Sequence, residues 1–179
     1  WTADGRLLGV PIVNTPESAT SNFNQPRNTF QECVDQIMND ANTALGLLPL
    51  DYGDITETGI PEKYVTLGVT NAGDYNRVNG NIMRGRVTAR IVEAIKAQVA
   101  LLAASPAYSA GTNVTWATAA DNAAIVLDRI GGVSGLSASG GTWYANTTEI
   151  ANLSSGANPA EIIWRGDVGQ SNSLEKSNF

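Results

Sequence analysis

The chain contains no histidine and one cysteine, Cys33, among its 179 residues. Without histidine it lacks the commonest general base, the Ser-His-Asp triad and most zinc sites. A single cysteine forms no intrachain disulfide, and Cys33 lies among apolar residues on one helix face, where a thiol acts as an inert core residue. These absences argue against an enzyme, and we expect no catalytic residues, no cofactor and no metal.

Positive charge is also scarce. The sequence has 11 Lys and Arg against 17 Asp and Glu, which gives a net charge of −6 without a basic cluster. Because phosphate binding needs concentrated Lys and Arg, the charge balance argues against nucleic acid as a partner. The chain also lacks an apolar run of about 18 residues, the length of a membrane-spanning helix, and an N-terminal signal sequence.

The most informative stretch is 84–104, which predicts one long helix. Its apolar or small residues recur at a spacing of three and four, as on one face of a helix. The helix should end near Ala104, because the residue before Pro106 disfavours helical backbone angles. The residues predicted to form the apolar face are Val87, Ile91, Ala94, Ile95, Val99, Leu102 and Ala103.

Two further helices are expected, at 29–47 and 115–130. The first begins with a capping box, Thr29 and Glu32, and is limited by Pro49. The second has an alanine-rich face that includes Trp116, and Gly131-Gly132 would supply its C-terminal cap. The helices at 84–104 and 115–130 should form an antiparallel pair.

The remaining segments predict long loops and a few short strands. Residues 49–83 form an irregular region, and 131–159 are rich in Gly, Ser and Asn. A strand or extended segment is expected at 10–13, and short strands at 64–67 and 161–164. We assign Trp116 and Trp164 to the core.

Several of these strings resemble one family. In the helix at 84–104, the residues Gly85, Arg86 and Thr88, and then the run that ends at Ser105-Pro106, closely resemble the long central helix of SusD/RagB-like proteins. These proteins are surface nutrient-binding lipoproteins of Bacteroidetes outer membranes. Four other segments resemble the family in the same order: 9–13 (GVPIV), 26–30 (PRNTF) leading to Leu48-Pro49, 116–120 (WATAA) and 161–164 (EIIW).

The resemblance implies a mainly α fold of tetratricopeptide-like helical hairpins, with residues 1–179 as the central part of a single domain truncated at both ends. It implies binding of a glycan, or less often a peptide, and delivery to a SusC-like TonB-dependent transporter. The protein would lie at the cell surface, and the lipid anchor to the outer membrane would belong to a segment absent from this chain. A helical-repeat adaptor that binds another protein is the alternative, and a carbohydrate-active enzyme is a weaker one.

Acidic residues gather in the 49–83 region: Asp51, Asp54, Glu57, Glu62 and Asp74. Two carboxylates could support glycoside hydrolysis, but no spacing fixes a pair. The spacing of the first three could also recruit Ca²⁺ through oxygen ligands, although it lacks the alternation and glycine of a calcium loop. The glycines at 80 and 85 have the outer spacing of a phosphate loop whose Lys and Ser or Thr are missing.

Loop aromatics are the better indication of a binding site. A flat ring covers the apolar face of a sugar while nearby amides bind its hydroxyl groups. The ligand-binding candidates are Trp143 and Tyr144, followed by Tyr64 and Tyr75. The alternative is that these rings hold their loops against the helical core.

Two cations have expected structural positions. Arg86 falls in the first turn predicted for the long helix, where the helix dipole disfavours a cation, so a carboxylate or loop carbonyls should hold it. Lys96 should lie off the apolar face with its stem packed and its amine in water.

Overall fold

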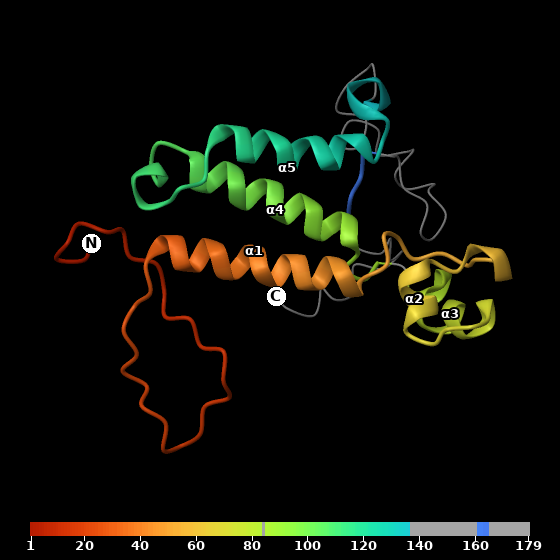
Figure 1. Ribbon diagram of the computed structural model, residues 1–179, viewed down its shortest axis with the longest axis horizontal. Helices are drawn as coiled ribbons and strands as arrows, with labels where there is room; N and C mark the ends of the chain where they lie inside the picture. Colours follow the sequence, from red (N-terminus) through yellow and green to blue (C-terminus); the bar gives the residue numbers. More distant parts are fainter. Residues whose placement is uncertain (84, 137–160, 165–179) are drawn as a thin grey trace, which may run out of the picture. The chain divides into compact units, whose positions relative to one another are not determined.

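The computed structural model describes residues 1–83, 85–136 and 161–164 (Figure 1). Its α-helices are α1 (Phe30–Leu47), α2 (Glu62–Thr66), α3 (Ala72–Asn79), α4 (Ala89–Ala104) and α5 (Trp116–Asp128). Short 3-10 helices are η1 (Glu57–Gly59), η2 (Asn81–Met83), η3 (Ser109–Gly111) and η4 (Gly132–Gly135). The described ranges contain no β-strand, only an isolated bridge between Leu8 and Thr29. The mainly α class is therefore confirmed, and the short strands expected at 64–67 and 161–164 are wrong.

The chain divides into two compact units. Unit 1 contains Trp1–Leu47 and Val92–Arg129, and unit 2 contains Leu48–Ile91 and Ile130–Phe179. Helix α4 begins in unit 2 and continues through unit 1.

The start of α1 is fixed by the capping box that the sequence predicts. The Thr29 N–H donates to Glu32 Oε2 at 2.7 Å, and the Glu32 N–H donates to Thr29 Oγ1 at 3.2 Å. Two backbone donors of the first turn are thereby satisfied. The hydrogen bonds from Thr29 and then Asn28 hold the pKa of the Glu32 carboxyl below its usual value. The capping box is therefore confirmed, and α1 ends at Leu47, ahead of Pro49.

An extended segment lies against the start of α1. The Gly9 N–H donates to the Asn28 carbonyl oxygen at 2.8 Å, and the Asn28 N–H donates to the Val10 carbonyl oxygen at 3.2 Å. A side chain at position 9 would overlap Cys33 Sγ, so glycine is required there. Residues 10–13 form no strand.

Helix α4 begins five residues later than the 84–104 prediction. Gly85 has φ +88°, a left-handed conformation that an α-helix does not contain. The Thr88 hydroxyl accepts a hydrogen bond from the Ile91 N–H at 3.3 Å, as a residue at a helix N-terminus does. The helix therefore starts at Ala89, and it ends at Ala104 as predicted.

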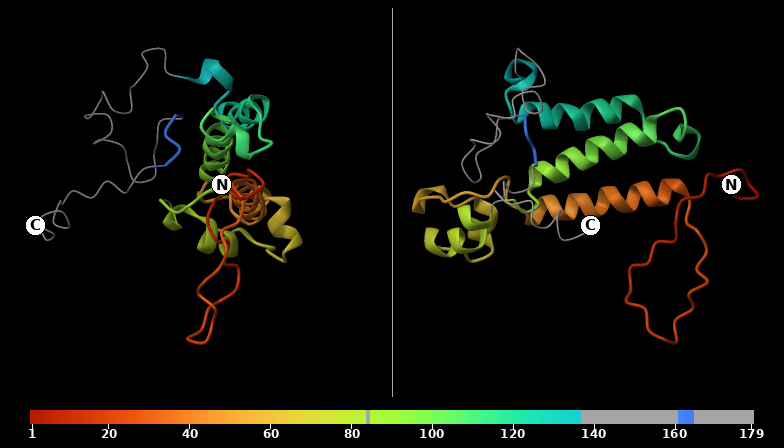
Figure 2. Two further views of the ribbon diagram at one scale, coloured as in Figure 1. Left: turned by 90° about the vertical axis from the view of Figure 1, so that its left-hand side faces the viewer. Right: turned by 180° about the vertical axis from the view of Figure 1, so that it is seen from behind.

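Within unit 1, α4 and α5 form the expected antiparallel pair (Figures 1 and 2). Ala100 and Ala104 near the end of α4 pack against Ala119 near the start of α5. These small side chains let the two backbones approach closely. The Thr115 hydroxyl caps α5 by accepting from the Thr118 N–H at 3.2 Å.

Helix α1 lies on the other side of α4 and runs antiparallel to it (Figure 1). Met38 of α1 contacts the alanine cluster. Lys96 Nζ donates to Asn42 Oδ1 at 2.8 Å. Near the start of α1, the Phe30 ring stacks on Tyr108 with centroids 5.0 Å apart. The three helices thus form one layer.

In unit 2 the prediction of an irregular region at 49–83 is wrong. It folds into α2 and α3, and the Asn71 side chain caps α3 by accepting from the Asp74 N–H at 2.8 Å. The Asn76 side chain bridges to Ile55, accepting from its N–H at 2.8 Å and donating to its carbonyl at 3.0 Å. The stretch that precedes the helices is thereby held against α3.

Candidate functional site

Tyr64 and Tyr75 are buried, with 7% and 4% of their surface exposed. Tyr64 lies on α2 and Tyr75 on α3, and their rings meet edge to face with centroids 5.2 Å apart. The expectation that both rings lie in loops, open to a ligand, is wrong. Their geometry is the alternative stated above, in which the aromatics hold a segment together.

Burial also changes the acidity of these two hydroxyl groups. It raises the pKa of Tyr64 to about 12, with smaller contributions from Tyr75 and Tyr52, and it raises the pKa of Tyr75. Lys63 Nζ lies 5.1 Å from the centroid of the Tyr64 ring and donates to the Leu48 carbonyl oxygen. Tyr64 and Tyr75 thus belong to the buried residues of unit 2.

Trp143 and Tyr144 lie outside the described residues. Their role as ligand-binding residues stays a prediction.

The assignment of Trp116 and Trp164 to the core is wrong. Trp116, the first residue of α5, is 57% exposed, and Trp164 is 60% exposed. The Trp164 indole N–H donates to the Gly85 carbonyl oxygen at 3.0 Å, which fixes the ring while leaving most of it uncovered. Trp1 is 69% exposed as well. All three described tryptophans therefore present an aromatic surface to solvent.

Three of the carboxylates in the 49–83 region contact other parts of the chain: Asp51, Asp54 and Glu57. Asp54 accepts from the Asn81 backbone N–H at 2.9 Å and from its side-chain amide at 2.8 Å. Glu57 accepts from the Ala72 N–H at 3.0 Å, and Asp51 lies 3.7 Å from Arg90 Nη1. In the described part of the chain, no group of three or more His, Cys, Asp or Glu residues could hold a metal ion. Asp54 and Glu57 thus hold backbone segments together.

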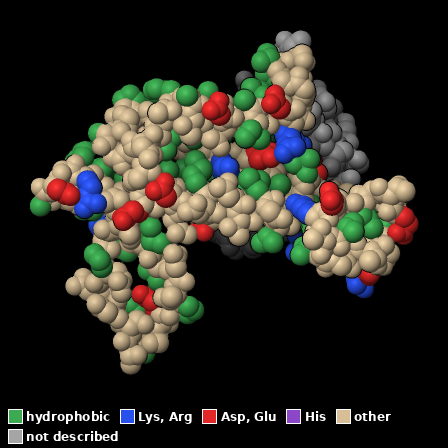
Figure 3. Space-filling model, viewed as in Figure 1, with side chains coloured by type: hydrophobic (Ala, Val, Ile, Leu, Met, Phe, Trp, Pro, Cys, Tyr) green, Lys and Arg blue, Asp and Glu red, His purple; other side chains and the backbone are tan. Residues whose placement is uncertain are grey.

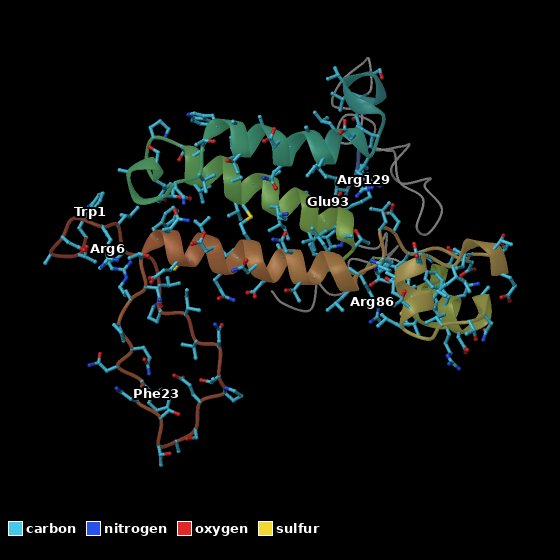
Figure 4. The ribbon with its side chains drawn as sticks, in the orientation of Figure 1. Trp1, Arg6, Phe23, Arg86, Glu93 and Arg129 are labelled. Carbon is cyan, nitrogen blue, oxygen red and sulfur yellow. The ribbon has the colours of Figure 1, made fainter. Side chains whose placement is uncertain are left out.

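The prediction for Arg86 is wrong. Arg86 precedes α4, is exposed, and has no side-chain hydrogen bond or ion pair with another described residue (Figure 4). Arg90, in the first turn of α4, has the carboxylate partner that was expected for Arg86. Its side chain is 19% exposed and faces Asp51. Lys96 is half-buried, and its amine donates to the Asn42 side chain rather than only to water.

A partly buried ion pair joins α4 to the end of α5, and the sequence did not reveal it. Arg129 Nε lies 3.0 Å from Glu93 Oε2, and Arg129 Nη2 lies 2.6 Å from Glu93 Oε1 (Figure 4). The Glu93 side chain is 8% exposed and that of Arg129 is 40% exposed. The indication in the sequence is that Glu93 directly precedes Ala94, which belongs to the predicted apolar face of the helix. The two-point contact suits a structural clamp between helices.

The helices of unit 1 carry apolar residues on a second face. On α4, Ile95 is 42%, Leu101 55% and Leu102 52% exposed, although two of these residues were predicted to be buried. On α5, Ile125 is 44% exposed and several alanines are exposed. Figure 3 shows hydrophobic side chains at the surface over these helices. These residues give α4 and α5 exposed apolar surface.

In comparisons with protein-family models, curated proteins and solved structures, the chain matches none of them. Among the described helices, none has the length and apolar character needed to cross a membrane.

Proposed function

We propose that this chain is part of a SusD/RagB-like protein that captures a glycan, or less often a peptide, and passes it to a SusC-like TonB-dependent transporter. The observation that carries the proposal is the ordered set of five segments that resemble this family. The full-length protein would sit at the cell surface, attached to the outer membrane by a lipid anchor. Residues 1–179 would be the central part of one such domain.

The positions of the resembling segments support the proposal. The segment 9–13 is hydrogen-bonded to 26–30 through Gly9, Val10 and Asn28. The segment 26–30 leads into α1, and the segment 116–120 opens α5. Two segments that resemble one family, 9–13 and 26–30, are thus neighbours within unit 1, as parts of one structural pattern would be. The antiparallel pair α4 and α5 would be a tetratricopeptide-type hairpin.

The ligand contact would come from Trp143 and Tyr144. The burial of Tyr64 and Tyr75 favours these two residues, since a buried ring offers no face to a sugar. An exposed indole covers the apolar C–H face of a sugar ring, and the asparagine at position 146 would bind hydroxyl groups.

We propose no catalytic activity. Glycoside hydrolysis needs two carboxyl groups free to act on the scissile bond. Asp54 and Glu57 accept hydrogen bonds from backbone N–H groups that would lose their partner if either acid moved to a substrate. The protein would bind the glycan and release it unchanged.

The test is a binding screen followed by product analysis. The chain would be run in native gels that contain single soluble polysaccharides, such as glucans, mannans and xylans, and any retardation quantified by calorimetric titration. We expect retardation by at least one polysaccharide without release of reducing sugar. Binding of none would contradict the proposal, and released sugar would favour a carbohydrate-active enzyme.

One observation favours a second candidate, the helical-repeat adaptor. The exposed apolar residues of α4 and α5 form a surface of the kind that binds another protein. For an adaptor, Leu102→Asp should abolish capture of a protein partner from cell extract, and no polysaccharide should retard the chain. For a glycan-binding protein, the same substitution should leave retardation by the polysaccharide unchanged.

A further inference from the structure

Asn79 and Gly80 form the only Asn-Gly pair in the chain. In such a pair the backbone nitrogen of the glycine, after losing its proton to hydroxide, can bond to the side-chain carbonyl carbon of the asparagine. The bond to the side-chain nitrogen then breaks, and that nitrogen takes a proton from water and leaves as ammonia, which regenerates hydroxide. Water opens the resulting succinimide to aspartate or isoaspartate. Glycine makes this ring closure easy because it has no side chain in the way.

Packing in unit 2 requires glycine at position 80. Gly80 directly follows α3, and a Cβ atom there would overlap the Asn76 carbonyl oxygen and Asp54 Oδ1. Both contacts are with polar oxygen atoms that are themselves held by hydrogen bonds. The fold therefore imposes the most reactive partner that an asparagine can have.

Hydrogen bonds of Asn79 and Gly80 hinder the reaction in the native fold. The Gly80 N–H, which must lose its proton, donates to the Asn76 carbonyl oxygen at 2.9 Å. The Asn79 carbonyl oxygen accepts from the Gly53 N–H at 3.1 Å, which resists rotation of the peptide between the two residues. Asn79 is 9% exposed, so water and hydroxide have little access to it.

We propose that Asn79 is a latent deamidation site, closed in the native fold and opened when the segment at Gly53 and Asp54 leaves α3. Local opening of this kind precedes global unfolding in many proteins. The product would be a carboxylate at position 79, and in its isoaspartate form a longer backbone at the end of α3. Either change disfavours return of the segment, so the modification would make the opening permanent.

The test compares the chain in native buffer with the same chain in concentrated urea, both at the same mildly alkaline pH. Peptide mass spectrometry would follow the replacement of the Asn79 amide by a carboxylate. We expect the native rate to be at least about tenfold lower, because in the native chain the segment must open before Asn79 can react. Each tenfold in rate corresponds to about 1.4 kcal/mol of opening free energy. Equal rates in the two buffers would overturn the proposal, and this comparison needs no variant.

A pair of variants then tests the opening step. Asp54→Ala removes the acceptor of the Asn81 N–H, whereas Asp35→Ala removes an exposed carboxylate of α1 that accepts from Gln31. In native buffer Asp54→Ala should deamidate severalfold faster than the unchanged chain, and Asp35→Ala at the unchanged rate. In urea all three should react alike. Equal native rates for the two variants would contradict the role given to Asp54.

Discussion

At the residue scale, side-chain type indicated chemistry but not exposure. Tyr64 and Tyr75 are suited to stacking on a sugar, yet their rings are buried in unit 2 and meet each other edge to face. Trp116 looks like a core residue by its position on an apolar face, yet it is exposed. Burial depends on which elements cover a side chain, and that information lies in the tertiary structure rather than in the residue itself.

The partly buried pair of Glu93 and Arg129 should matter for stability. Arg129→Ala leaves the Glu93 carboxylate buried without this partner, and we expect a loss of about 2–3 kcal/mol, somewhat below a fully buried pair because Arg129 is partly exposed. Arg86→Ala is the matched control and should change stability by less than about 0.5 kcal/mol. Urea unfolding of both variants measures the two losses. Equal losses would show that the pair is not a clamp.

The two buried tyrosines predict a loss of stability at alkaline pH. Because burial raises their pKa values above the usual 10.0, the stability they contribute is fully present below about pH 10. It is lost as the pH rises toward about 12, where Tyr64 ionises in the folded chain. Tyrosinate absorbance and circular dichroism recorded in one titration would check this. Ionisation of all tyrosines near pH 10 with the helices intact would contradict the burial.

At the element scale, the long helices were predictable and the short ones were not. α1, α4 and α5 have caps and enough turns for an apolar period to show. α2 and α3, with five and eight residues, are too short for a period to be distinguished from irregular chain. The start of α4 was placed too early because Gly85 and Thr88 were read as helix, although one is left-handed and the other caps the helix. Its buried face was also predicted wrongly in part, because apolar residues lie on more than one side of α4 and Ile95 and Leu102 are exposed.

The capping box of α1 gives a prediction at this scale. Thr29→Ala removes the hydroxyl that accepts from the Glu32 N–H and should cost about 1 kcal/mol. Thr43→Ala is the control within the same helix. Its hydroxyl donates only to the Asn39 carbonyl oxygen in the preceding turn. Because alanine has the higher helix propensity, the stability should stay equal or rise by roughly a few tenths of a kcal/mol. Thermal melts of both variants decide, and a larger loss for Thr43→Ala would contradict the capping role.

At the scale of the whole molecule, the fold class was predictable from the sequence. The capped helices at 29–47 and 115–130 and the proline after the long helix were sufficient to indicate a mainly α chain. The interior of unit 2 was not predictable, because it depends on Asp54, Asn76 and Glu57 bonding to backbone groups more than ten residues away in sequence. For the candidate site the sequence predicts only a type of chemistry, an aromatic surface with amides. The structure removes Tyr64 and Tyr75 from that surface, and the roles of Trp143 and Tyr144 stay a prediction.

The central claim is that the chain binds a glycan through Trp143. Calorimetric titration of the retarding polysaccharide against Trp143→Ala, paired with a thermal melt, tests it most directly. Trp143→Ala should weaken binding by roughly 1–3 kcal/mol, as loss of an exposed stacking ring does, and leave the melting temperature nearly unchanged. Tyr75→Ala should do the reverse and lower the melting temperature, because its ring is buried. Unchanged binding by Trp143→Ala, or a melting temperature lowered as far as in Tyr75→Ala, would contradict the account.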